Sequence, residues 1–232
     1  MHIPDGFLDP KISTGLLGAA SAVMAFCLAK VREMVTALQP QEALATAGRN
    51  ISSLPGRMRR VLTEEGEQLI YRIGMVASLV FAAQMFNFPI SHGTSGHLIG
   101  GVFAALILGP FAGTIAMTAV LLIQSIFFAD GGLMALGANV INMAVIGAFL
   151  CYYIYFFLKK ALPEWAAIFI SAWTSVILAA LTCALEIGLS GTAPFSLIIP
   201  AMLKVHIIIG LAEGFITVAL VNLFRIMIKE KA

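Results

Sequence analysis

The run WAAIFISAWTSVILAALTCALEIG, residues 165–188, decides the fold class of this chain. It contains one charged side chain, Glu186, and roughly 20 apolar residues suffice for a helix to cross the hydrocarbon core of a bilayer. The whole chain of 232 residues is 60% hydrophobic and 11% charged, whereas about a quarter of a soluble domain is charged. With a mean hydropathy of +0.97, the sequence predicts an all-α integral membrane protein. No basic run interleaved with aromatic residues indicates nucleic-acid binding.

Further apolar runs extend this pattern on both sides. They are residues 12–29, 69–86, 98–109, 111–128, 139–158 and 201–228. Together with residues 165–188 they predict seven transmembrane helices within one membrane domain, residues 1–232. We interpret the first run as a retained helix and not as a signal peptide, because Asp5 and Asp9 stand where a signal peptide has basic residues.

Basic residues test the number of crossings. With seven crossings, an extracellular N-terminus and a cytoplasmic C-terminus, only Lys11 and Lys204 of the 14 Lys and Arg lie outside. This distribution follows the positive-inside rule. Fusing residues 98–109 with 111–128 would carry Lys159, Lys160 and the C-terminal basic residues outside, so seven crossings are favoured. The polar loop 30–68 is then cytoplasmic, and we expect short amphipathic helices or a solvated loop there.

The run 98–109 is too short to cross alone. Twelve residues rise about 18 Å as a helix, well below the roughly 30 Å of hydrocarbon. The preceding segment, residues 87–96, should therefore dip inward, where its backbone must be buried in protein or line a cavity. Interrupted segments of this kind often hold transported substrate. The same topology puts the N-terminal loop, residues 1–11, on the same side as His92, His97 and the turn at residues 130–132.

The first two residues offer a chelate. The terminal amine of Met1, the amide nitrogen of His2 and Nδ1 of its imidazole close two adjacent rings on one ion, so three nitrogens fall in a plane. A fourth nitrogen would complete a square. All-nitrogen ligands in that geometry suit Ni(II) or Cu(II), and Co(II) less naturally, whereas Zn(II) prefers a tetrahedron.

Four motifs now point to a family. They are MHIPDGFL at residues 1–8, GTSGHLIGG at 93–101, AALILGP at 104–110 and FFADGGLMALGAN at 127–139. In this order they resemble the CbiM and NikM proteins, the substrate-binding membrane subunits (S components) of energy-coupling factor (ECF) transporters for cobalt and nickel. The resemblance covers nearly the whole chain. It implies a six-helix S-component bundle with an extra N-terminal helix.

The resemblance also implies a ligand set and partners. The metal would be bound by the amine of Met1, the amide nitrogen and imidazole of His2, and a loop histidine that matches His97. The implied partners are a membrane coupling (T) subunit, ATPase subunits and a small accessory membrane subunit of the CbiN/NikN type, in a prokaryotic cell membrane. Ni²⁺ or Co²⁺ would be the transported ligand and not a cofactor. The loop 30–68 is longer than is usual in the family, and His92 is unexpected.

Accessory roles are open for several polar residues. His92 could bind the ion at the entrance, and Ser95 or Asn139 could hold His97 in one tautomer. Asp5 could neutralise the entering cation or cap a turn. Deeper in the membrane, Glu186, Lys204 and His206 are expected to form a structural ion-pair cluster rather than a metal site.

Small residues at helical spacing offer a docking surface. Gly74, Ser78 and Ala82 form such a ladder, and so do Ala25 and Ala29. The first ladder would suit the coupling subunit, and packing within the bundle is the alternative.

The function predicted is binding without catalysis. The chain has no Walker A, HExxH or GxSxG sequence, so ATP hydrolysis is assigned to partner subunits. An ion-coupled secondary metal transporter that acts without ATPase partners is the alternative, and it would use Glu186, His206 and Glu213. An intramembrane metalloenzyme would need an open coordination position and a general base.

Overall fold

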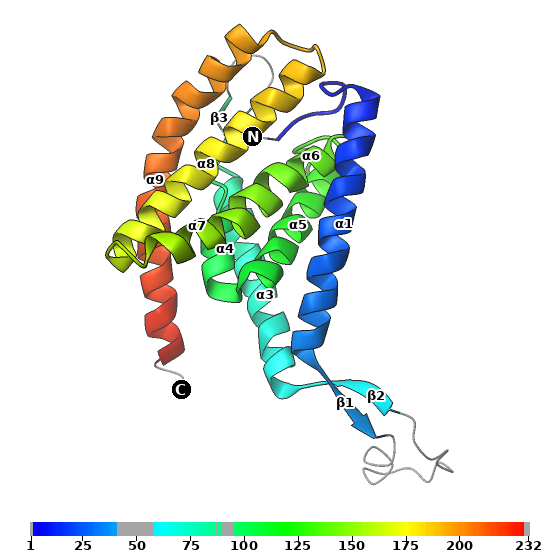
Figure 1. Cartoon of the computed structure of the whole chain (residues 1–232), viewed down its shortest axis with the longest axis vertical. Coiled ribbons are helices and arrows are strands. Elements are labelled where there is room, and N and C mark those ends of the chain that lie inside the picture. Colours follow the sequence, from blue (N-terminus) through cyan, green and yellow to red (C-terminus); the bar gives the residue numbers. More distant parts are fainter. Residues whose placement is uncertain (1, 41–57, 87, 90–94, 230–232) are drawn as a thin grey trace.

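Helices packed side by side build the fold (Figure 1). The computed structural model describes residues 2–40, 58–86, 88–89 and 95–229. The helices are α1 (Pro10–Val35), α3 (Glu64–Gln84), α4 (Gly101–Leu108), α5 (Pro110–Phe127), α6 (Leu136–Val140), the π-helix η2 (Ile141–Leu150), α7 (Cys151–Leu158), α8 (Glu164–Leu189) and α9 (Phe195–Lys229). The strands of this part are β1 (Thr36–Pro40), β2 (Met58–Leu62), β3 (Phe88–Pro89) and β4 (Ser95–Gly96).

A helix of the structure falls on each predicted apolar run. Three consecutive helical elements, α6, η2 and α7, fall on the run 139–158 and together count as one crossing. In the described part, five helical stretches are long and apolar enough to cross a membrane: Pro10–Val35, Pro110–Phe127, Leu136–Leu158, Glu164–Leu189 and Phe195–Met227. The helical multi-pass membrane class is thereby confirmed. The count of seven crossings and the extracellular N-terminus stay predictions, since α3 and α4 are not among these five.

The short helix α4 is buried at the centre of the bundle. Its eight residues rise about 12 Å, and Val102, Phe103 and Ala104 are at most 2% exposed. Helices α3, α5, α8 and α9 and the π-helix η2 all contact it. Protein therefore surrounds the backbone just before α4, as a chain inside a membrane requires. Of the segment 87–96, residues 87 and 90–94 lie outside the described residues, and β3 pairs antiparallel with β4.

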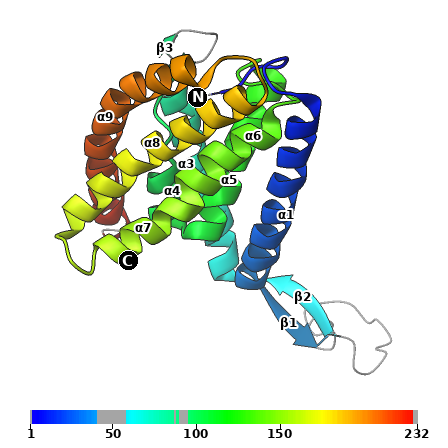
Figure 2. The same ribbon diagram turned by 45° about the horizontal axis from the view of Figure 1, so that its top comes forward.

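The polar loop 30–68 corrects one expectation. Helix α1 continues to Val35, and β1 and β2 then pair as an antiparallel ribbon that projects away from the helices (Figure 1 and Figure 2). Amphipathic helices are therefore wrong for the described part of this loop; residues 41–57 lie outside it. The reason is tertiary: the backbone N–H of Thr63 donates to the Val35 carbonyl at 3.0 Å, which joins the end of α1 to the start of α3. The two chains leaving this junction are neighbours and can pair.

The small residues of α3 face outward. Gly74, Ser78 and Ala82 are all exposed, and nothing lies within 4 Å of where a side chain on Gly74 would begin. Ala25 and Ala29 on α1 are exposed as well. Among the residues that the structure describes, neither ladder is used for packing between helices.

Candidate metal centre

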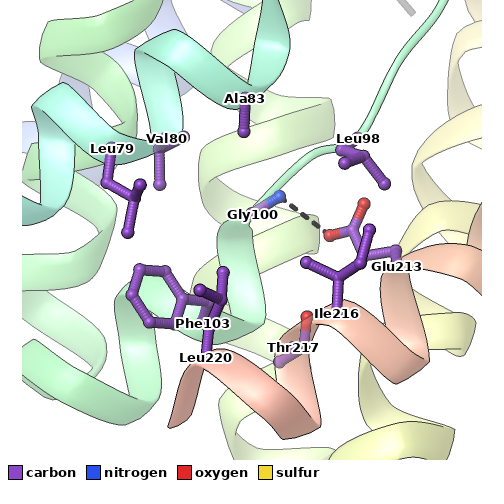
Figure 3. Close-up of a pocket in the computed structure, with 10 residues that line it drawn as sticks. All are labelled: Leu79, Val80, Ala83, Leu98, Gly100, Phe103, Glu213, Ile216, Thr217 and Leu220. Atoms are coloured by element: carbon purple, nitrogen blue, oxygen red, sulfur yellow. Dashed lines mark hydrogen bonds between the residues drawn. The ribbon is translucent and has the colours of Figure 1, made fainter. Parts of the chain in front are cut away.

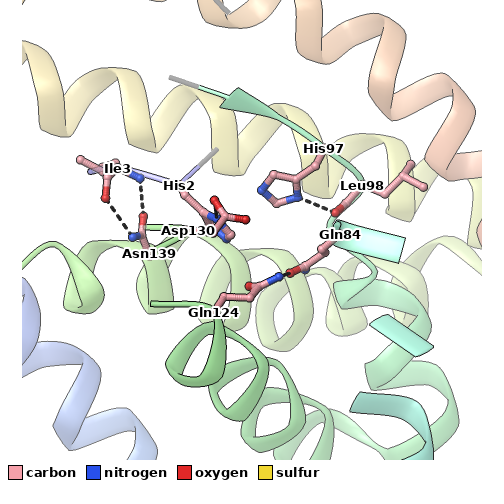
Figure 4. A network of polar contacts seen from close by, with 8 residues as sticks. All are labelled: His2, Ile3, Gln84, His97, Leu98, Gln124, Asp130 and Asn139. Atoms are coloured by element: carbon pink, nitrogen blue, oxygen red, sulfur yellow. Dashed lines mark hydrogen bonds and ion pairs between the residues drawn. The ribbon is translucent and has the colours of Figure 1, made fainter. Parts of the chain in front are cut away.

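The N-terminal segment is threaded into one end of the bundle. Ile3 is fully buried, and its N–H donates to Oδ1 of Asn139 at 2.8 Å. The amide of Asn139 returns a bond from Nδ2 to the Ile3 carbonyl at 3.2 Å, and the Gly132 N–H donates to the same carbonyl at 2.9 Å (Figure 4). These bonds satisfy the main chain of Ile3 at a depth where unpaired groups are costly. They fix the position of the neighbouring His2.

Asp5 holds the segment from the other side. Its carboxylate accepts the N–H groups of Leu133 at 3.2 Å and Met134 at 2.8 Å. Farther along, the Thr192 hydroxyl donates to the Phe7 carbonyl at 2.5 Å. The carboxylate of Asp5 is therefore engaged as a cap of the 132–134 turn, and not as a free charge for an entering cation.

Two glycines permit this close approach. Gly131 has φ +91°, a conformation that favours glycine, and a Cβ there would lie 3.4 Å from the Cβ of His2. A Cβ on Gly132 would clash with both the side chain and the backbone nitrogen of Asp5. The pair Gly131-Gly132 is thus required for residues 2–5 to lie against the turn.

His2 is 3% exposed, and its Nδ1 lies 2.7 Å from Oδ1 of Asp130. A carboxylate only accepts, so Nδ1 carries the proton and Nε2 carries the lone pair in the neutral ring. Among the residues that the structure describes, nothing bonds to this buried Nε2. Burial lowers the pKa of His2, although the bond to Asp130 opposes the shift. The ring is therefore neutral at neutral pH.

His97 lies against His2. Its ring centroid is 4.6 Å from that of His2 with the planes at 50°, and the residue is 1% exposed. Nδ1–H donates to the Leu98 carbonyl at 2.7 Å, so Nε2 again holds the lone pair and has no partner in the described part of the chain. Burial holds the pKa of His97 well below its usual value, and the nearby His2 adds to the shift. Both imidazoles are thus buried, neutral bases, the state that binds a transition metal.

A chain of amides supports this pair. Nε2 of Gln84 on α3 donates to the Ile99 carbonyl at 2.6 Å, and Nε2 of Gln124 on α5 donates to Oε1 of Gln84 at 3.0 Å (Figure 4). The main-chain carbonyl of Gln124 accepts the N–H of Asp130 at 3.1 Å. The loop behind His97 is therefore linked to the residue that contacts His2.

The predicted site residues meet different outcomes. His2 and His97 lie together, whereas Met1 and His92 lie outside the described residues. Ser95 lies in β4, two residues before His97. Asn139 does not hold His97 in one tautomer, because its amide is used on Ile3 and the Leu98 carbonyl takes that role. That expectation for Asn139 is wrong.

The expected cluster deeper in the membrane is also wrong. Glu186 accepts from Nδ2 of Asn142 at 2.7 Å, and Lys204 is exposed on α9. Nδ1 of His206 donates to the Met202 carbonyl, one turn back on its own helix. Among the described residues, no ion pair joins Glu186 to Lys204 or His206. A lysine at this position on α9 points outward, so it cannot meet a carboxylate inside the bundle.

The sequence did not reveal the roles of Asp130, Gln84 and Gln124. Asp130 stands inside one of the four motifs, which is the signal that could have singled it out. The described residues contain no group of three or more His, Cys, Asp or Glu arranged to hold a metal ion.

Comparisons with known proteins identify the family. Residues 2–230 match the family model CbiM, described as the cobalt uptake substrate-specific transmembrane region. The chain is 38% identical over 224 residues to a protein of Archaeoglobus fulgidus named as a fused nickel transport protein, NikMN, covering 96% of this chain and 64% of that protein. It is 33% identical over 161 residues to the cobalt transport protein CbiM of Sorangium cellulosum, covering 66% of this chain and 72% of that one.

A solved structure shares the fold. A crystal structure described as a truncated transition metal transporter superposes with a TM-score of 0.77 at 30% identity, covering 96% of this chain and 97% of that one. The chain spans less than two thirds of the fused Archaeoglobus protein, so that protein's whole activity does not transfer by likeness alone. The family match covers nearly every residue, including the four motifs. The chain therefore belongs to the CbiM family of substrate-specific membrane regions for cobalt uptake.

Proposed function

We propose that this chain is the substrate-specific membrane subunit of an ECF-type transporter that takes up Ni²⁺ or Co²⁺. One observation carries the proposal: His2 and His97, 95 positions apart in sequence, bring two buried imidazoles to a centroid distance of 4.6 Å. In the described part of the chain, each has an Nε2 with no bonding partner. Two neutral imidazoles in a water-poor site are suited to a borderline transition metal and not to a hard cation.

The proposed ligands are the Met1 amine, the His2 amide nitrogen, His2 Nδ1 and His97 Nε2. Nδ1 of His2 now bonds Asp130, so the chelate requires the ring to release that carboxylate and its proton to move from Nδ1 to Nε2. The protons released on metal binding would then come from the His2 amide nitrogen and the terminal amine, and not from the ring. Supporting this, the bonds of Ile3 to Asn139 hold the backbone next to the proposed ligands in a fixed position.

Partner subunits are proposed to supply the energy. The fused relatives NikMN of Archaeoglobus fulgidus and Rhodobacter capsulatus are longer than this chain, which spans 64% and 60% of them. Their names as fused NikMN proteins support an accessory unit of the CbiN/NikN type as a partner here. The exposed ladder of Gly74, Ser78 and Ala82 supports docking of a membrane coupling subunit, because small residues allow helices to approach closely. The proposed location is a prokaryotic cell membrane.

The test is metal binding by the purified chain. Ni²⁺ and Co²⁺ are titrated into the chain as written and into a variant with one additional, protease-removable residue ahead of Met1. We expect the extra residue to lower the affinity sharply, because the primary amine moves away while the His2 imidazole stays. Proteolytic removal should restore binding and serves as the matched control. Equal affinity before and after removal would contradict the chelate.

The alternative, an ion-coupled transporter without ATPase partners, is tested separately. Glu186 and Glu213, the buried carboxylates it would use, already accept bonds from Asn142 and from the backbone of Ile99 and Gly100. Vesicles that contain this chain alone are given ⁶³Ni²⁺ with and without a proton gradient. Gradient-driven accumulation without ATPase subunits would favour this alternative over the ECF assignment.

A further inference from the structure

Glu213 lies inside the bundle on α9 and is 1% exposed. Its Oε2 accepts the N–H of Ile99 at 2.5 Å, and its Oε1 accepts the N–H of Gly100 at 2.8 Å (Figure 3). Both carboxylate oxygens are therefore used on two successive backbone groups of one short segment. That segment begins two residues after His97.

These two bonds replace a missing helix cap. Gly100 is the N-cap of α4 and has no side chain to cap the helix, and its φ of +74° suits glycine. Free N–H groups at a helix N-terminus attract negative charge, and a carboxylate makes stronger bonds to them than a neutral acceptor does. Glu213 therefore caps α4 from another helix, which ties α9 to the loop of His97.

The same segment is held from the opposite side. The carbonyl of Ile99 accepts the bond from Gln84 on α3 at 2.6 Å, while its N–H goes to Glu213 on α9. Ile99 itself is fully buried. The ring of His97 is in turn oriented by Leu98, the residue between it and this point. The direction of the imidazole is thus set by a backbone segment that is hydrogen-bonded to α3 on one side and to α9 on the other.

A small cavity lies next to the hydrogen bonds between Glu213 and the segment Ile99–Gly100. A largely apolar cavity of about 30 Å³, room for about one water, lies between α3 and α9 beside Gly100 (Figure 3). Leu98, Gly100 and Glu213 all line it. This space allows only a small shift of Leu98 and Gly100 when the bonds to the carboxylate are lost.

We propose that Glu213 is a positioning residue for metal binding: its carboxylate clamps Ile99 and Gly100 so that His97 faces the N-terminal segment. The inference rests on the proposed metal-binding function. It also makes the position of His97 depend on the spacing of α3 and α9. Relative movement of these helices would change the affinity for the ion without touching any other ligand.

The test compares two carboxylates on neighbouring helices. Glu213→Gln keeps the size of the side chain but turns one acceptor into a donor that opposes a backbone N–H. Glu186→Gln is the matched control: it removes another buried membrane carboxylate, which bonds Asn142 and not the loop. Ni²⁺ is titrated into each purified full-length chain. We expect Glu213→Gln to lower the affinity about 10- to 100-fold, as loss of a group that orients a ligand does, and Glu186→Gln to bind as the parent chain.

A double-mutant cycle separates positioning from general damage. In a His97→Ala background, Glu213→Gln should have no further effect on Ni²⁺ affinity, because it acts through the missing ring. The ligand-field spectrum of bound Ni²⁺ should change in the same way in Glu213→Gln and His97→Ala. The inference would be overturned if Glu213→Gln abolished Ni²⁺ binding both in the parent chain and in the His97→Ala chain. It would also be overturned if Glu213→Gln bound Ni²⁺ with the affinity and spectrum of the parent chain.

Remaining outcomes are also decisive. If Glu213→Gln does not fold, Glu213→Asp takes its place: it keeps both acceptors on a shorter stem, and parent-like binding of Ni²⁺ by it would overturn the clamp. If the parent chain itself binds no Ni²⁺ or Co²⁺, the proposed function fails and the inference falls with it. If the parent chain binds and needs His97 but not Glu213, only the inference fails.

Discussion

The two ends of the molecule are held together differently. At the end that carries His2 and His97, hydrogen bonds join residues far apart in the chain, such as Ile3 and Asn139, which are 136 positions apart. At the opposite end, the β1–β2 ribbon closes a connection in which Thr63 meets Val35, 28 positions away (Figure 1). Ordering distant segments costs conformational entropy, so such bonds persist where a fixed geometry is needed. Changes at the first end should therefore reach the metal, and changes at the second should not.

The largest expected effect is that of His97→Ala. Removing the loop imidazole should lower Ni²⁺ affinity by about 100-fold or more, beyond what loss of a supporting group causes. Calorimetric titration of the purified chain measures it. The control at the opposite end is Arg60→Ala, which removes only an exposed 3.3 Å bond to Thr36 and should leave the affinity unchanged. If His97→Ala bound Ni²⁺ as tightly as the parent chain, the prediction that only changes at the His97 end alter the affinity would be wrong.

Gly132→Ala should come next. Its Cβ would collide with Asp5, so the N-terminal segment must leave the turn, and Ni²⁺ affinity should fall about tenfold or more. Gly18→Ala on α1 is the control, because nothing lies within 4 Å of the new Cβ and alanine favours a helix. The same titration checks both variants. An equal effect of the two would mean that close approach at residues 131–132 is not required.

Acid should weaken binding in a way that Asp130 controls. Protons compete with the metal for the proposed ligand nitrogens, so the affinity should fall as the pH drops from neutral toward about pH 5. Burial lowers the pKa of His2 and of His97, so the part of this fall that comes from their rings should lie below the usual value of 6.5. The bond to Asp130 raises the pKa of His2. Asp130→Asn should therefore lower that pKa and move the fall to more acidic pH. Titrations at several pH values measure the midpoint, and a flat profile would rule out the ligand set.

The smallest effect is expected at the ribbon end. Lys30 and Glu33 form an exposed pair at 3.0 Å, and such pairs contribute about 0–1 kcal/mol. Lys30→Ala should change the free energy of unfolding by no more than that and leave Ni²⁺ affinity unaltered. Denaturant unfolding and titration of one preparation give both values. A loss of affinity would show that the two ends are coupled.

Much of the fold could be predicted from local sequence. The run 98–109 was predicted to be too short to cross alone because only twelve residues precede Pro110, and α4 is short and central. The β1–β2 ribbon could not be predicted, because its pairing follows from the meeting of α1 and α3 at Val35 and Thr63. Such a contact belongs to the packed bundle and leaves no periodic trace in the sequence.

The meeting of His2 and His97 was predicted, but the groups that hold these two residues in place were not. The proximity of His2 and His97 followed from motifs and topology. The partners of Gln84 and Glu213 are main-chain atoms of Ile99 and Gly100, and any residue supplies such atoms. No pattern of side-chain types could have identified these bonds. Asn139 was expected to hold His97 in one tautomer, and only the structure gives the main chain of Ile3 as its partner.

At the proposed metal site, the burial of both imidazoles would select among ions by how readily they lose water. His2 and His97 are at most 3% exposed, so an ion that joins them must shed water and accept nitrogen in its place. Mg²⁺ dehydrates reluctantly and prefers oxygen ligands, and Ca²⁺ needs six to eight oxygens. For either cation, the free energy lost on removing its water ligands would exceed the free energy gained from coordination by two ring nitrogens. Rejection of the common hard ions would thus be decided at the entrance to the protein interior.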